Sequence, residues 1–224
     1  RLGIILMFMW SVVDAQDFVV RGLSVYGQDD EVNPPIIVRD SAGYANPLSQ
    51  YITIQFDVLG EEPPPLRIRF LHCNRDWVPD QNLFVQDETH NLSFALDYRS
   101  SPGGVEYYSY RYMNRFPDKD DIVRFNFSGN WIFRLVDKEE TTVYGEGRFF
   151  VVDEVTKTTV AVTNDYFTHA VSPLNQVHKV QVDVRLRDEI DGYFYTTVDV
   201  YQNRKFFHPY RIDVNDRDPY TRVE

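Results

Sequence analysis

Apolar and polar residues alternate in many short segments of the chain, and a two-residue period is typical of half-buried β-strands. The clearest alternation covers residues 51–59, where four apolar residues are separated by Thr53, Gln55 and Asp57. Further segments with strand character lie at 18–26, 36–39, 66–71, 91–98, 105–112, 122–127, 131–136 and 147–152. No amphipathic segment of helical length interrupts them. The pattern predicts an all-β fold, an immunoglobulin-like β-sandwich over residues 18–153.

The connections between these segments are predicted from their turn-forming residues. Residues 60–65 are expected to form a hairpin connection and residues 128–130 a turn, while 78–90 and 114–121 are expected to be polar loops. Pro34 and Pro35 precede the segment 36–39 and confine it to a sheet edge, because proline cannot donate a ladder hydrogen bond.

A second series of strands is expected after a polar junction at residues 153–157. Its segments lie at 158–162, 176–185, 193–201 and 206–212. Four strands without closing partners are too few for a second sandwich. The expectation is therefore the start of a second β-domain, over residues 158–224, which the chain leaves incomplete.

Residues 1–15 have the pattern of a secretory signal peptide. Arg1 is followed by an apolar block, and Ala15 lies where signal peptidase requires a small residue. The block is shorter than the roughly 18 to 20 residues that cross a bilayer, so we expect no direct membrane insertion. The alternative is an N-terminal core strand.

Charge and cysteine content limit the kinds of partner and of stabilisation. The formal net charge is −11, which argues against a nucleic-acid partner because a polyphosphate backbone would be repelled. With 43% hydrophobic residues the chain has ample material for a core. A single cysteine, Cys73, excludes an internal disulfide, and its apolar neighbours favour burial.

The segment His72–Trp77 contains the residue types that are most often reactive in proteins, a histidine and the single cysteine. His72 and Cys73 would be the members of a catalytic dyad, but neighbours on a strand point to opposite faces. The favoured interpretation is a packed corner in which Trp77 covers Cys73. Asn74 and Asp76 then accept backbone N–H groups, and Arg75 pairs with a carboxylate such as Asp97.

Of three other kinds of site, zinc is disfavoured and the other two are open alternatives. The remaining histidines show no zinc-ligand spacing relative to Cys73. The segment 213–219 offers Asp213, Asp216 and Asp218 as calcium ligands, although a solvated acidic turn is the plainer interpretation. A tyrosine row formed by Tyr108, Tyr110 and Tyr112 would stack on sugar rings, or belong to the core or a protein interface.

Several short motifs occur in one order along residues 18–153. They are His-Cys-Asn-Arg-Asp-Trp at 72–77, Asp97-Tyr98 followed by Ser101, the tyrosine-rich segment 107–112, Phe116-Pro117, Ser128-Gly129-Asn130-Trp131, and Arg-Phe-Phe-Val-Val at 148–152. In this order they resemble the N-terminal domain of the plug protein of the type IX secretion system. The chain departs from that pattern in its aspartate-rich link 118–121 and in Phe116, where asparagine is common.

The resemblance implies a function as well as a fold. It implies a periplasmic, non-enzymatic β-sandwich protein without a cofactor, which binds the outer-membrane barrel translocon and closes its periplasmic opening. The residues it marks as structural are His72, Cys73, Asp76, Trp77, Asp97, Tyr98, Ser128, Gly129 and Trp131. The alternative function is a secreted carbohydrate-binding β-sandwich that uses Tyr108, Tyr110 and Tyr112.

Overall fold

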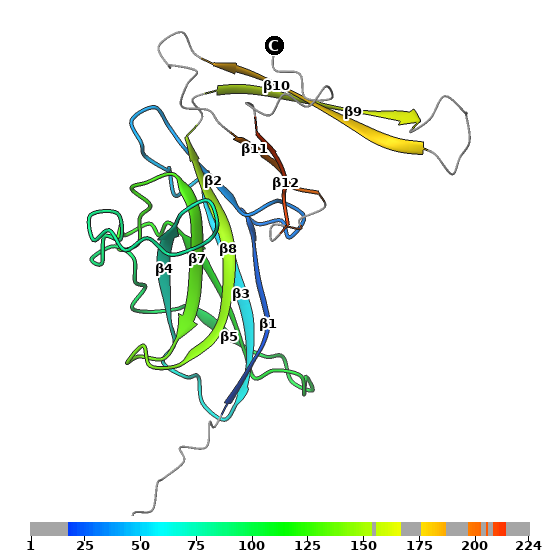
Figure 1. Ribbon diagram of the computed structural model, residues 1–224. Coiled ribbons are helices and arrows are strands. Elements are labelled where there is room, and N and C mark those ends of the chain that lie inside the picture. The colour runs from blue at the N-terminus through cyan, green and yellow to red at the C-terminus, as the bar shows by residue number, and fades with distance from the viewer. Residues whose placement is uncertain are drawn as a thin grey trace, which may run out of the picture.

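The computed structural model describes residues 18–153, 156–166, 176–186, 197–202, 205 and 208–213. Within these residues every regular element is a strand (Figure 1). The first eight strands are β1 (Phe18–Gly27), β2 (Ile36–Arg39), β3 (Ile52–Gly60), β4 (Arg67–Cys73), β5 (Tyr98–Ser100), β6 (Tyr110–Phe116), β7 (Gly129–Val136) and β8 (Val143–Asp153). No helix in this part of the chain is long and apolar enough to cross a membrane.

Two four-stranded sheets form the predicted sandwich. One sheet has the order β1-β3-β6-β5 and the other β2-β8-β7-β4. All neighbours are antiparallel except β2 and β8, which run parallel. The orders β1-β3-β6-β5 and β8-β7-β4 correspond to the A-B-E-D and G-F-C sheets of constant-type immunoglobulin domains. The all-β sandwich is thus confirmed, and immunoglobulin-like character beyond strand order remains a prediction.

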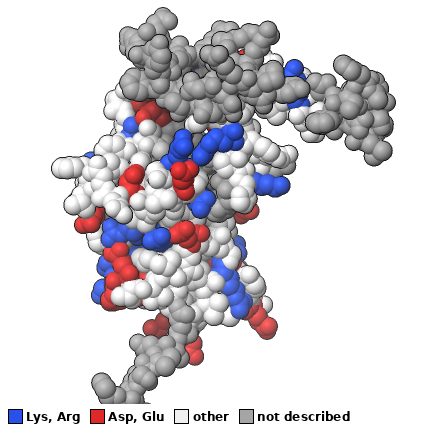
Figure 2. Space-filling model, in the orientation of Figure 1, with Lys and Arg blue, Asp and Glu red and all other residues white. Residues whose placement is uncertain are grey.

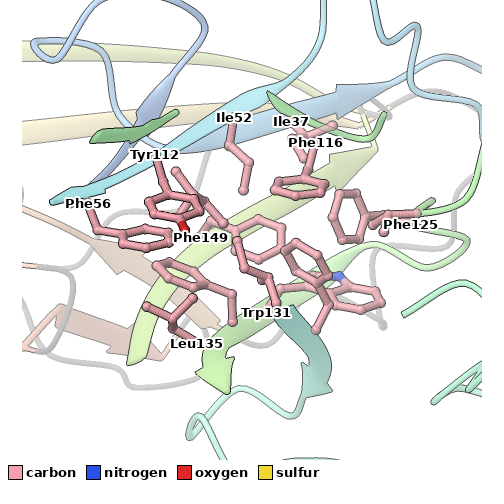
Figure 3. Close-up of a cluster of buried hydrophobic side chains, with 14 of the residues drawn as sticks. Ile37, Ile52, Phe56, Tyr112, Phe116, Phe125, Trp131, Leu135 and Phe149 are labelled. Atoms are coloured by element: carbon pink, nitrogen blue, oxygen red, sulfur yellow. The ribbon is translucent and has the colours of Figure 1, made fainter. Parts of the chain in front are cut away.

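The core lies between the two sheets and is rich in aromatic rings (Figure 3). The predicted inward face of β3 is fully buried, with Ile52, Ile54, Phe56 and Val58 all inaccessible to solvent. Opposite them, Phe70 of β4 meets the rings of three other phenylalanines at centroid distances of 4.9 to 5.9 Å. The two-residue period in the sequence therefore identifies the inward face of β3 and of β4.

Two predicted strands are absent from the structure. Residues 91–97 are irregular, because their backbone bonds only briefly to β4: Phe70 N–H donates to the carbonyl of Asn91, and Ser93 N–H to that of Ile68. Residues 122–127 are also irregular. Their first backbone groups are taken by the carboxylate of Asp118, which accepts the N–H groups of Ile122 and Val123. In residues 122–127 a side-chain acceptor has thus taken the place of the backbone hydrogen bonds that a strand needs.

Strand β6 begins and ends later than predicted. The segment 105–109 precedes the strand, and residues 114–116, expected in a loop, continue it. The polar residue Asn114 is the reason that a loop was predicted to begin at this position. It is buried, and its side-chain amide bonds both the N–H and the carbonyl of Asp97, so a polar residue occupies a core position without an unsatisfied group.

Three predicted connections also differ. Residues 60–65 link β3 to β4 in the opposite sheet, so they form a crossover and not a hairpin. Strand β4 continues past Leu71 to Cys73, and β7 already begins at Gly129 within the expected turn. The other expectations for the sandwich hold: β2 lies at a sheet edge, and residues 78–90 contain no strand.

Two further strand pairs follow the sandwich. Strands β9 (Thr156–Tyr166) and β10 (Gln176–Leu186) form one antiparallel pair, and β11 (Thr197–Val200) and β12 (Tyr210–Asp213) form another. All four segments predicted in this part of the sequence thus contain a strand. The expected division into domains, with a second β-domain over 158–224, stays a prediction. The expected signal segment 1–15 lies outside the described residues.

Candidate functional site

Two of the sequence motifs meet at one corner of the sandwich, where β4 and β7 are paired. His72 is the register partner of Trp131, and Cys73 that of Asn130. His72 Nδ1 lies 2.5 Å from a carboxylate oxygen of Asp80, and its Nε2 lies 3.0 Å from the carbonyl oxygen of Ser128. Its ring also meets the indole of Trp131 edge-on at 5.1 Å. Both ring nitrogens of His72 thus face oxygen atoms of the surrounding chain.

Gly129 is required by this packing. Its φ of 141° lies in a region that side chains rarely adopt, and an added Cβ would lie 2.6 Å from His72 Nε2. Beside it, the indole N–H of Trp131 donates to the carbonyl of Phe127 at 3.1 Å. The Ser-Gly-Asn-Trp motif therefore has a physical basis: it lets the β7 backbone approach the histidine ring closely and fixes the buried indole next to it.

The turn after β4 is fixed by amide side chains. Asn74 Oδ1 accepts the N–H groups of Asp76 at 2.9 Å and Val78 at 3.0 Å, which confirms the predicted role of Asn74. Asn130 donates from β7 to the carbonyls of Asn74 and Arg75, each at 3.2 Å. An Asx-type turn is thus held both from within and from the neighbouring strand.

Asp76 and Arg75 behave differently from their predictions. The carboxylate of Asp76 accepts from Arg211 Nη1 at 3.1 Å, and the Nε of Arg75 lies 3.8 Å from it. Asp76 therefore pairs with arginine side chains and not with the backbone of its own turn. Arg75 pairs with Asp76 and not with Asp97, whose backbone is bonded by Asn114 in the other sheet.

Trp77 lies on the outer side of the corner in a left-handed backbone conformation, with φ of 63°. Its indole meets Phe150 edge-on at 5.2 Å, and the guanidinium of Arg148 lies 4.7 Å from its centre. Phe150 in turn contacts Tyr201, which precedes β12, at 5.3 Å. Tyr201 thus contacts β8 of the sandwich, and Arg211 contacts the turn after β4. The predicted contact of Trp77 with Cys73 stays a prediction.

Cys73 is buried, as predicted, with 2% of its surface exposed. Burial raises the pKa of its thiol to about 11. Its sulfur lies 3.6 Å from the carbonyl of Leu71, whereas both ring nitrogens of His72 have other partners. His72 and Cys73 are therefore not arranged as a catalytic dyad at this corner. The raised pKa also keeps the thiol protonated, and a protonated thiol is a poor nucleophile.

Cys73 is expected to resist labelling in the folded protein. Raising the thiol pKa from 9 to about 11 lowers the thiolate fraction at neutral pH about a hundredfold, and burial slows access further. An aromatic disulfide reagent should react fully with Cys73 only after unfolding, and with a native pH profile that rises toward pH 11. In the variant Ser49→Cys, the added exposed thiol should react at once. Fast reaction of both thiols at neutral pH would contradict the burial.

The predicted tyrosine row is not a single row. Tyr112 is buried, stacks on Phe56 at 4.7 Å and donates its hydroxyl to the carbonyl of Pro64. Tyr110 shares its face, and both rings lie near Tyr98. Tyr108 precedes the strand and lies under Arg111, whose side chain points to the opposite face. A sugar-binding platform needs exposed coplanar rings, which this arrangement does not offer.

The described residues contain no group of side chains that forms a metal-binding site. No group of three or more His, Cys, Asp or Glu side chains there is arranged to hold an ion. The predicted calcium segment 213–219 lies outside the described residues, apart from the backbone of Asp213.

Sequence reasoning missed two ionic partners that the fold brings together. Asp80 lies eight residues after His72 in an irregular loop. Asp57 of β3 binds Arg111 of β6 through two bonds of 2.7 and 2.9 Å. One indication of the pair between Asp57 and Arg111 is present in the sequence. Asp57 is a carboxylate within a strongly apolar strand, where its position is half-buried and a charge requires a partner.

Comparisons with known proteins agree with the order of motifs. The family described as "Type 9 secretion system plug protein 1st domain" matches residues 20–153. No curated protein matches the chain. Among solved structures, a hypothetical protein from Parabacteroides merdae is similar, with 20% identity and a TM-score of 0.63. That similarity covers 85% of this chain and 45% of the other, and shows a shared fold. By the match over residues 20–153, the chain belongs to the type 9 secretion system plug protein family.

Proposed function

We propose that the chain is a periplasmic accessory subunit, associated with the outer membrane, that binds the barrel translocon of type IX secretion and plugs its periplasmic opening. The observation that carries the proposal is the family match over the whole sandwich, residues 20–153. This match gives the chain a role related to type IX secretion in the bacterial envelope. The specific partner and the plugging action are the proposed part.

The corner residues support a binding role over a catalytic one. Cys73 is buried with a raised thiol pKa, and His72 is fixed between Asp80 and Ser128. In an enzyme such groups would face a cleft and keep a bond free for substrate. Here they hold a strand junction together. A rigid sandwich with a dense aromatic core suits a body that must block an opening without deforming.

Binding and plugging are tested separately. An affinity-tagged version of the protein, expressed in its native envelope, is expected to co-purify with an outer-membrane barrel protein after detergent extraction. For the second step, the isolated barrel is reconstituted in a planar bilayer, and addition of the protein on the periplasmic side is expected to lower its conductance. A protein that fractionates only as a soluble monomer would count against binding. Co-purification without any change in conductance would refute plugging.

A further inference from the structure

One residue from each strand of the sheet β1-β3-β6-β5 forms a continuous row across its outer face. Arg21 of β1 is the register partner of Asp57 on β3, Asp57 that of Arg111 on β6, and Arg111 that of Arg99 on β5. Register partners point to the same side of a sheet. Because Phe56 and Val58 point into the core, this row points to the outside. We call it the arginine row.

The middle of the arginine row is neutralised and its two ends are not. Asp57 is only 6% exposed and accepts two bonds from Arg111, which raise the pKa of that guanidinium. Arg21 donates to the carbonyl of Tyr107 at 2.9 Å. Neither Arg21 nor Arg99 has a carboxylate partner among the described residues. The row therefore carries two uncompensated positive charges on a chain whose net charge is −11.

The opposite sheet shows a different arrangement of charge. There Arg69 pairs with Glu140 and Arg134 with Glu146, each at 2.8 Å. Basic and acidic side chains lie next to one another on the face shown in Figure 2. These two arginines are thus compensated within the protein. Arg21 and Arg99, at the ends of the arginine row, differ from these two pairs and leave their positive charge available to a partner.

Exposed apolar groups surround the arginine row. The ring of Tyr107 lies 5.0 Å from the guanidinium of Arg21, and 57% of that residue is exposed. Val19, two positions before Arg21, is 51% exposed, and Met113, two positions after Arg111, is 50% exposed. Arginine, tyrosine and methionine are enriched at protein interfaces, where a flat cationic and apolar surface meets a complementary one.

We propose that the arginine row docks a carboxylate-bearing polypeptide segment of a partner protein. Neighbouring strands are about 4.8 Å apart, so Arg21 and Arg99 are separated by roughly 14 Å. An extended chain advances about 3.4 Å per residue, so two acidic residues about four positions apart match that separation. A polypeptide fits better than a polyphosphate or an anionic bilayer, because its side chains also cover Val19, Tyr107 and Met113 while its backbone adds no charge.

The test uses a synthetic extended peptide with glutamate at two positions four residues apart, and a reference peptide with glutamine there. Amide NMR shifts around the arginine row should move with the glutamate peptide and not with the reference. The double variant Arg21→Glu, Arg99→Glu should bind about tenfold more weakly, and added salt should no longer weaken its binding, because attraction becomes repulsion. Arg75→Glu, a charge reversal at an exposed residue of the turn after β4, should bind as the unmodified protein does.

The proposal rests on the proposed function only for the identity of the partner. Peptide binding tests the surface itself, and co-purification of the double variant with the barrel tests its use. If the double variant loses the peptide and the barrel, the arginine row is the docking surface. Equal binding of both peptides, preference for inorganic polyphosphate, or full retention of the barrel by the double variant would overturn it. Failure of the unmodified protein to co-purify would instead refute the proposed function.

Discussion

Phe70→Ala is expected to lower the free energy of unfolding by about 3 to 5 kcal/mol, the usual cost of truncating a buried phenylalanine. Phe70 is inaccessible to solvent and meets Phe116, Phe125 and Phe149 edge-on. These partners come from β6, the irregular segment 122–127, and β8, so one ring joins both sheets and a loop. Rigid aromatic neighbours cannot collapse into the space left by the ring, so the cost should lie in the upper part of the range.

Chemical denaturation followed by circular dichroism measures this effect, with Phe84→Ala as the matched control. Phe84 is 89% exposed on the loop between β4 and β5, so its truncation should change the free energy of unfolding by less than about 0.5 kcal/mol. Equal destabilisation by the two substitutions would show that Phe70 is not the center of the core described above.

Gly129→Ala should lower the free energy of unfolding by roughly 2 to 4 kcal/mol, from backbone strain and steric overlap together. The strain arises because φ at this position is 141°. The overlap arises because the new Cβ would lie 2.6 Å from Nε2 of His72. The ring cannot move away without giving up its bonds to Asp80 and Ser128. Thermal unfolding, measured by differential scanning calorimetry, reports the loss.

Gly103→Ala is the matched control, because no atom lies within 4 Å of its added Cβ and its φ is not positive. It should leave the unfolding temperature nearly unchanged. The two contributions at Gly129 separate in the background His72→Ala, which removes the overlap and keeps the strain. There Gly129→Ala should cost less than in the unmodified protein, as a double-mutant cycle measures. An equal cost in both backgrounds would mean that His72 does not restrict this position.

The two-residue period was sufficient to predict the sandwich and the inward faces of its regular strands. The apolar residues of β3, namely Ile52, Ile54, Phe56 and Val58, are buried as their alternation requires, and so are Ile68 and Phe70 of β4. It failed where a side chain satisfies the backbone. Asp118 turns an apolar segment into irregular structure, and Asn114 lets a polar position continue β6. The local periodicity of a sequence does not show which backbone group a polar side chain will bond, and that bond decides whether a strand forms or continues.

Prediction of the candidate site from the sequence was limited in the same way. The order of motifs led to the family and to the corner, and the burial of Cys73 followed from its apolar neighbours. The contact of His72 with Ser128 spans 56 residues, and the pair of Arg111 with Asp57 spans 54. A single sequence does not show which distant strands become neighbours. The predicted role of Asp76 was wrong for that reason, since its partner Arg211 lies 135 residues later.

The parallel pairing of β2 with β8 determines when the sandwich can be completed. Ile36 is the register partner of Phe150, and Arg39 bonds Asp153 across 114 residues of sequence. During synthesis, β2 has no partner in its sheet until almost the entire domain has emerged. Such non-local closure makes folding slow, in the millisecond to second range for comparable β-sandwiches. The unpaired strands are meanwhile open to aggregation, until the arrival of β8 completes their sheet.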